Sequence, residues 1–324
     1  MQHVIAHPDG ILAIDSGFGR PGLAAVHIVI HQGRAAIIDA GTNASVPGIL
    51  TALAAAGIEP ARVDWLMLTH IHLDHAGGAG SLMCALPNAK VLLHPRALRH
   101  MVDPAYLLHA TEDIYGADKV FEWYGRLMPI AEERLVVAED GMIVDLAGRS
   151  FTVLDAPGHA RHHICIYDEA ARAFFSGDAF GISYRELDIN GRAFVIPTTT
   201  PSQFDPDAMH ATISRLMAYE PEAMYLTHYS RVVDVNRLAS DLHRLVDAYV
   251  AVARAAGDEG VARHVQILSG LEQLIKDERE RQGWVMSESD VLQFLRFDLE
   301  LNAQGLGMWL DTAKEKKTIS AQPA

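Results

Sequence analysis

Cysteine is scarce in this chain of 324 residues, which contains only Cys84 and Cys165. Two cysteines exclude a disulfide framework as the main source of stability. Long apolar runs are also missing: no stretch of about 18 apolar residues occurs, so we expect no transmembrane helix and no membrane partner. The N-terminus lacks a basic start followed by an apolar stretch, which argues against a signal peptide. We therefore expect a cytoplasmic protein.

Basic residues are in deficit as well. The chain has 27 Lys and Arg against 41 Asp and Glu, which gives a formal net charge of −14. Because a nucleic acid needs a basic surface opposite its phosphates, we expect no nucleic-acid partner. An acidic surface favours a small-molecule substrate that is neutral or held by local groups. Hydrophobic residues make up 49% of the chain, which is enough for a substantial core.

Metal-binding side chains are concentrated in one stretch, Thr69-His70-Ile71-His72-Leu73-Asp74-His75. The apolar run at 64–68 predicts a buried strand before it, and the glycines at 77–80 predict a turn towards a helix. Ligands at the end of a strand converge on a cleft, and imidazole and carboxylate groups suit zinc, iron or manganese. Burying these groups without partners would cost several kcal/mol, whereas a metal would satisfy them. The stretch therefore predicts a metal site.

The H-x-H-x-D-H pattern of this stretch resembles the signature of the metallo-β-lactamase superfamily. The remaining elements of that signature are matched, in the family's order, by segments at the ends of other predicted strands. These segments are Ala36-Ile37-Ile38-Asp39-Ala40-Gly41, Asp155-Ala156-Pro157-Gly158-His159, Ser176-Gly177-Asp178 and Met224-Tyr225-Leu226-Thr227-His228. The resemblance covers residues from about 20 to 230.

The resemblance implies a binuclear site for two divalent metal ions, most simply zinc, with iron or manganese as alternatives. The first ion would be held by His70, His72 and His159, the second by Asp74, His75 and His228, and Asp178 would bridge the two. Asp39 matches a position that the family keeps near the site. We expect His163 to orient the ligating groups, as metal ligands require, and its neighbour His162 to face solvent.

The function implied by this resemblance is that of a hydrolase. Two ions about 3.5–4 Å apart can share a hydroxide, which would attack the carbonyl of a small thioester, lactone or other ester. The second ion would stabilise the oxyanion, and either a water on that ion or Asp74, the candidate catalytic residue, would hand a proton to the leaving group. Glyoxalase II enzymes and lactonases of the family are the nearest models. Lactonases place a Tyr three residues after the bridging Asp, where this chain has Gly181, so the substrate stays open.

Two other classes of function share this fold. Diiron oxygen-binding and redox members usually carry a Glu at the position of His72, so the histidine favours a hydrolytic, zinc-type site. A non-catalytic ligand-binding member would have no reason to keep a complete ligand set. Both stay as alternatives to the hydrolase.

Segments with strand patterns recur in both halves of the first 232 residues. Together with the resemblance they predict an α/β fold, an αββα sandwich of two stacked mixed sheets flanked by helices, as the catalytic domain over 1–232. Apolar residues at helical spacing then predict an all-helical C-terminal extension over 233–312, with helices at 234–256, 259–281 and 288–303. We expect residues 313–324 to be disordered. A homodimer would give the apolar helix faces a surface on which to pack.

Aromatic residues mark the expected substrate pocket. An insert at about 103–133 is rich in them, and Tyr106 and Trp123 are candidates for the pocket wall. A long irregular segment from Phe180 to Phe204 lies between two ligand segments, where binding loops are common. Tyr184 is its candidate for contact with the substrate.

Overall fold

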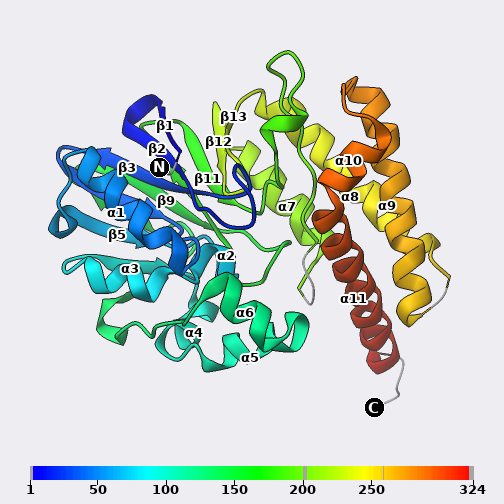
Figure 1. Cartoon of the computed structure of the whole chain (residues 1–324), viewed down its shortest axis with the longest axis horizontal. Coiled ribbons are helices and arrows are strands. Elements are labelled where there is room, and N and C mark those ends of the chain that lie inside the picture. The colour runs from blue at the N-terminus through cyan, green and yellow to red at the C-terminus, as the bar shows by residue number, and fades with distance from the viewer. Residues whose placement is uncertain (1–2, 200–202, 258, 321–324) are drawn as a thin grey trace. The chain divides into compact units, whose positions relative to one another are not determined.

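A computed structural model describes residues 3–199, 203–257 and 259–320 (Figure 1). Contacts between residues divide the chain into two units. The first unit consists of residues 3–156, 162–178 and 219–235, and the second contains 157–161, 179–218 and the chain from 236 onwards. Within the described ranges, every helix is too short or too polar to pass through a membrane.

Two mixed sheets form the first unit, as the sequence predicts. The seven-stranded sheet has the order β1 to β7 and the six-stranded sheet the order β13-β12-β11-β10-β9-β8. The strands of the first sheet are β1 (Val4–His7), β2 (Ile11–Asp15), β3 (Ala25–His31), β4 (Arg34–Ile38), β5 (Val63–Met67), β6 (Lys90–Leu93) and β7 (Leu135–Val137). Those of the second are β8 (Ile143–Leu146), β9 (Arg149–Asp155), β10 (Ile164–Asp168), β11 (Ala173–Gly177), β12 (Ala223–Leu226) and β13 (Ser230–Val232).

The side chains of β4 show why these sheets stack. Successive residues of a strand face opposite sides, and in β4 Ala36 and Ile38 pack against residues of the second sheet such as Phe151 and Phe175. Ala35 and Ile37 face the other side, towards the helices α1 (Val46–Ala55) and α3 (Ala79–Ala85). A strand that is buried on both faces reads as a continuous apolar run, as β4 does.

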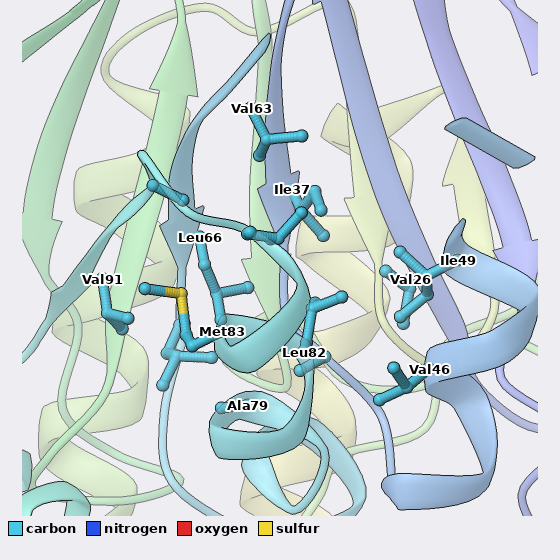
Figure 2. Packing of buried hydrophobic residues seen from close by; sticks show 14 of the residues in the cluster. Val26, Ile37, Val46, Ile49, Val63, Leu66, Ala79, Leu82, Met83 and Val91 are labelled. Atoms are coloured by element: carbon cyan, nitrogen blue, oxygen red, sulfur yellow. The ribbon is translucent and has the colours of Figure 1, made fainter. Parts of the chain in front are cut away.

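Figure 2 shows the core on the helical side of the first sheet. Val26, Ile37, Leu66 and Val91 project from four neighbouring strands towards Val46 and Ile49 of α1 and Leu82 and Met83 of α3. This layer completes half of the predicted αββα sandwich. It also holds rigid the end of β5 from which the His-rich stretch begins.

Of the other helices of the first unit, α2 (Leu73–Ala76) contains the end of the His-rich stretch, α4 (Leu98–Val102) precedes the insert, and α5 (Ala105–Tyr115) and α6 (Ala117–Tyr124) belong to the insert. The second unit contains α7 (Pro206–Met217) and the helices α8 (Val235–Ala255), α9 (Gly260–Gln282), α10 (Glu288–Phe294) and α11 (Arg296–Ser320). Asp205 caps α7 by accepting a hydrogen bond from the backbone N–H of Ala208 at 3.1 Å, and Pro206 occupies its first turn.

The C-terminal helices differ from the prediction in one respect. The segment expected as one helix at 288–303 is divided between α10 and α11, and α11 then runs to Ser320 instead of ending near 303. Gly305 and Gly307 argue against helix in the sequence, because each costs about 1 kcal/mol relative to Ala. Burial of Leu299, Ala303 and Leu306, on the helix that packs beside α9, outweighs that cost. Helix thus replaces the disorder expected over 313–320, and 321–324 lie outside the described residues.

Candidate metal centre

The ligand candidates of the first unit all follow the C-terminal ends of strands. His70 and His72 lie in the turn after β5, and Asp74 and His75 lie on the short helix α2 that this turn starts. Asp178 follows β11, and His228 follows β12, its parallel neighbour. Because the two sheets stack, the ends of β5, β11 and β12 meet at one edge of the sandwich. The fold therefore brings together residues that are about 160 positions apart in the sequence.

The distances within the cluster are those of side chains that could share an ion. Ligand atoms of His70, His75 and Asp178 lie within 4.8 Å of one another, and so do those of Asp74, His75 and His228. Nε2 of His75 is 3.4 Å from Oδ1 of Asp178, and Nε2 of His228 is 3.3 Å from Oδ2 of Asp74. Nδ1 of His72 lies 2.8 Å from Nε2 of His70. Two overlapping triads are thus assembled from one unit.

Hydrogen bonds fix which nitrogen of His75 and of His228 faces the cluster. Nδ1 of His75 donates to Oδ2 of Asp39 at 2.8 Å, and Nδ1 of His228 donates to the backbone carbonyl of Leu23 at 2.8 Å. Both acceptors can only accept, so both Nδ1 atoms carry the proton. The Nε2 atoms therefore face carboxylate oxygens of Asp74 and Asp178. The lone pair of a neutral imidazole would repel these oxygens, so the arrangement requires either a second proton on the ring or a cation among the groups, and it fits a divalent metal ion.

The pKa shifts express the same excess of negative charge. Burial would lower the pKa of His75, but the carboxylates of Asp74, Asp178 and Asp39 outweigh it and raise the pKa to about 10. The pKa of His228 is also raised, against the effect of burial, chiefly by Asp178 and Asp74. Burial opposes the ionisation of Asp74, yet His75 and His228 bring its pKa below the ordinary value. The cluster therefore favours positive charge at its centre.

Asp39 lies beside this cluster and accepts hydrogen bonds from the residues around it. Its Oδ1 accepts a hydrogen bond from the backbone N–H of Thr69 at 2.8 Å, and its Oδ2 accepts one from the hydroxyl of Thr227 at 2.9 Å, besides the bond from His75. Asp39 has a φ of +60°, a left-handed conformation that Asp and Asn tolerate better than most residues. One carboxylate thus ties together the two strand ends that carry the ligands.

Sequence reasoning missed the two threonines that bind Asp39. Thr69 precedes His70, and Thr227 precedes His228, so a Thr-His pair ends both strands. This repeated Thr-His pair is the sequence signal from which both threonines could have been found. His163 contacts a different ligand: its Nε2 accepts a hydrogen bond from the backbone N–H of Asp178 at 3.2 Å.

The expectation for His162 is wrong. It is only 9% exposed instead of facing solvent, and its ring centroid lies 5.4 Å from that of His72 and 6.1 Å from that of His70. Burial lowers the pKa of His162 to about 4. The error arose because burial of a loop side chain depends on segments distant in the sequence, here the stretch at 70–72.

The structure places His159 and Tyr184 in the second unit. His159 lies in the loop at 157–161 between β9 and β10, with Nδ1 2.8 Å from the hydroxyl of Thr198. Tyr184 is buried and donates a hydrogen bond to Oδ1 of Asp298 at 2.9 Å. The first unit by itself therefore assembles six of the seven predicted ligands: His70, His72, Asp74, His75, Asp178 and His228.

The two aromatic candidates of the insert have different surroundings. Tyr106 is 68% exposed, and its ring lies 5.5 Å from that of His100. Trp123 is half-buried and packs with Val120, Tyr124 and Leu73, the residue between His72 and Asp74.

Comparison with known proteins identifies a family. The model of the metallo-beta-lactamase superfamily matches residues 19–228. The metallo-beta-lactamase fold-containing protein ST1585 of Sulfurisphaera tokodaii is 25% identical over 211 residues, which are 64% of this chain and 73% of that protein. Its crystal structure matches with a TM-score of 0.64 at 22% identity and covers 93% of this chain and 99% of that chain.

Relatives named for an activity match over shorter stretches. A hydroxyacylglutathione hydrolase of Stenotrophomonas maltophilia is 32% identical over 152 residues, 47% of this chain and 44% of that enzyme. The acyl-coenzyme A thioesterase MBLAC2 of Gallus gallus is 30% identical over 192 residues, 52% of this chain and 62% of that protein. The chain therefore spans about half the length of these relatives, less than two thirds in each case.

Proposed function

Because the chain belongs to the metallo-beta-lactamase superfamily, most of whose members are hydrolases, we propose that it is a binuclear metal-dependent hydrolase of a small thioester. The observation that carries the proposal is the orientation of His75 and His228, whose Nε2 atoms face the carboxylates of Asp74 and Asp178. Among thioesters, lactones and other esters, two relatives favour the thioester by their names.

Each ion has a set of ligands in this proposal. His70, His72 and His159 hold the first ion, Asp74, His75 and His228 the second, and Asp178 lies between them. Bound there, two divalent ions, most simply zinc, would supply a nucleophile from water at neutral pH and polarise the substrate carbonyl.

Asp74 is the residue that we assign to proton transfer. Its side chain is 20% exposed, whereas that of Asp178 is 8% exposed and that of His75 is fully buried, so a leaving group reaches Asp74 most easily. The lowered pKa of Asp74 keeps the carboxylate ionised at neutral pH. It would therefore first accept a proton from the water that supplies the nucleophile and then pass that proton to the thiolate that leaves. Asp39 and His163 would act through the ligands that they orient.

The test is elemental analysis of the freshly purified protein together with a screen of thioesters, lactones, phosphodiesters and β-lactams. We expect close to two equivalents of metal and turnover of thioesters. His70→Ala and Asp178→Ala should lose metal and activity together. His109→Ala is the matched control, because this histidine is exposed on the insert and its loss should change neither quantity. Iron with oxygen reactivity and no ester turnover would replace the proposal by a redox function, and full activity of Asp178→Ala would refute it.

A further inference from the structure

The insert of the first unit contains an open groove of about 470 Å³. Its walls come from the end of α4, from α5 and α6 and from the segment after α6, and they are mainly apolar: Val102, Pro104, Leu108, Phe121, Leu127 and Pro129. The volume lies within the roughly 300–1,000 Å³ that is usual for small-molecule sites. Phe121 is 69% exposed at this groove, which leaves a large apolar surface in contact with water.

The groove adjoins the metal-binding stretch through shared side chains. Leu108 and Leu127 line the groove and also pack around a cluster formed by Val120, Tyr124 and Leu73. Leu73 is 4% exposed and lies between His72 and Asp74 in the chain. A ligand in the groove would therefore rest on the same packed layer that supports the metal ligands.

Two anchors fix the lip of the groove to the body of the first unit. The side-chain amide of Asn43 donates hydrogen bonds to the backbone carbonyls of Tyr124 at 2.6 Å and of Arg126 at 2.9 Å. Gly80 of α3 lets the chain pass closely at Met128, because a Cβ there would lie 2.0 Å from its carbonyl oxygen. The groove is thus preformed, which reduces the entropic cost of binding.

The charges at the groove decide which part of a thioester it suits. Asp103, Glu112 and Arg126 are the charged residues of its lining, with a net charge of −1. Carriers that bear carboxylates or phosphates are disfavoured beside two carboxylates, whereas a hydrocarbon chain is not. From this geometry we infer that the groove binds the hydrocarbon acyl chain of the substrate. The inference rests on the proposed function only in assigning that chain to a thioester.

The experiment combines a binding measurement with a kinetic one, both on the full chain. The neutral alcohol 1-dodecanol is titrated calorimetrically, which requires no turnover. In parallel, kcat/KM is measured for butanoyl, hexanoyl, octanoyl and decanoyl thioesters of N-acetylcysteamine. Because each buried CH₂ contributes about 0.8 kcal/mol when fully covered, we expect kcat/KM to rise about two- to fourfold per added CH₂ in a partly open groove.

Two exposed alanines of α5 provide a matched pair of variants. Ala105 lines the groove and Ala110 does not, so Ala105→Phe should fill the groove while Ala110→Phe adds the same volume outside it. We expect Ala105→Phe to weaken the binding of 1-dodecanol at least tenfold and to abolish the chain-length preference. Ala110→Phe should behave as the unmodified protein. Equal behaviour of the two variants would overturn the inference.

A second pair of variants tests the groove without adding volume to it, in case Ala105→Phe prevents correct folding. Phe121→Ala removes a wall, whereas Phe297→Ala removes an exposed aromatic ring of α11 that does not line the groove. Only Phe121→Ala should weaken the binding of 1-dodecanol. If binding follows this pattern but no thioester is hydrolysed, the proposed function fails and the groove stands. If thioesters are hydrolysed without any chain-length preference, and the variants bind alike, the groove does not bind the acyl chain and the proposed function stands.

Discussion

His75 and His27 are both buried imidazoles of the first unit, with exposures of 0% and 1%, yet their pKa values move in opposite directions. Burial and, to a smaller extent, the nearby His7 lower the pKa of His27 to about 3, while the pKa of His75 rises to about 10. His27 lies between the sheets beside Phe175 and Tyr225, with ring centroids 5.5 Å away in both cases. His75 is surrounded by three carboxylates.

The comparison shows that burial alone does not identify a functional histidine. His27 is maintained neutral as part of the core, whereas His75 is held where only a cation satisfies its neighbours. In the metal-free protein, protonation of His75 contributes stability that is complete below pH 6.5 and is lost as the pH rises through about 10. For His27 the sign is reversed. The following predictions separate the two kinds of site.

Removal of metal should have the largest effect. Because a ligand at 1,000 times its Kd stabilises a protein by about 4 kcal/mol, a chelator should lower the melting temperature by roughly 10 °C. Differential scanning calorimetry with and without chelator measures this, and added zinc should restore the original value. In His75→Ala the chelator should change little, whereas in His27→Gln it should act as on the unmodified protein. If the chelator does not change the melting temperature, the assignment of the cluster as a metal site is contradicted.

Replacement of Asp39 by Asn should weaken metal binding about 10- to 100-fold, the usual effect of losing a partner that orients a ligand. Asn tolerates the left-handed φ of +60°, so the substitution adds no backbone strain. Competition with a chromophoric chelator measures the affinity. Asp15→Asn is the control, since Asp15 is also buried in the first unit but accepts hydrogen bonds from the backbone N–H groups of Gly17 and Gly22. Equal affinities in both variants would remove Asp39 from the support of His75.

The core histidine should appear in the pH dependence of stability. Its pKa is lower in the folded state than the ordinary 6.5, so protons bind the unfolded chain more tightly. Stability is therefore complete above pH 6.5 and falls as the pH is lowered towards 3, by about 2 kcal/mol between pH 6.5 and 5. Urea unfolding measures the free energy of unfolding at each pH. In metal-free His27→Gln, its loss between pH 6.5 and 5 should be smaller by about 2 kcal/mol. An unchanged slope would mean that another group causes the loss.

The sequence predicts the fold and most of the cluster because the relevant signals are local. The strand patterns and the strings around His70, Asp178 and His228 each lie within a few residues, and the fold and the cluster of these side chains agree with them. Features that depend on distant partners escaped it. The burial of His162 against His72 is one example, and the extension of α11 by packing on α9 is another. The lining of the groove on the insert is a third, since Tyr106 and Trp123, the residues expected in a pocket wall there, are not among its lining residues.

The smallest effect on metal affinity is expected at Thr227, which is linked to His75 through Asp39. Its hydroxyl donates a hydrogen bond of 2.9 Å to Oδ2 of Asp39. The same oxygen accepts the hydrogen bond from Nδ1 of His75. Thr227→Val keeps the shape and removes one hydrogen bond, worth about 1 kcal/mol, so metal affinity should fall roughly fivefold. Thr51→Val removes an exposed hydroxyl bonded to the carbonyl of Pro47 and should change nothing. An effect on stability without one on metal affinity would show that Thr227 holds the strand end in place but does not act through His75.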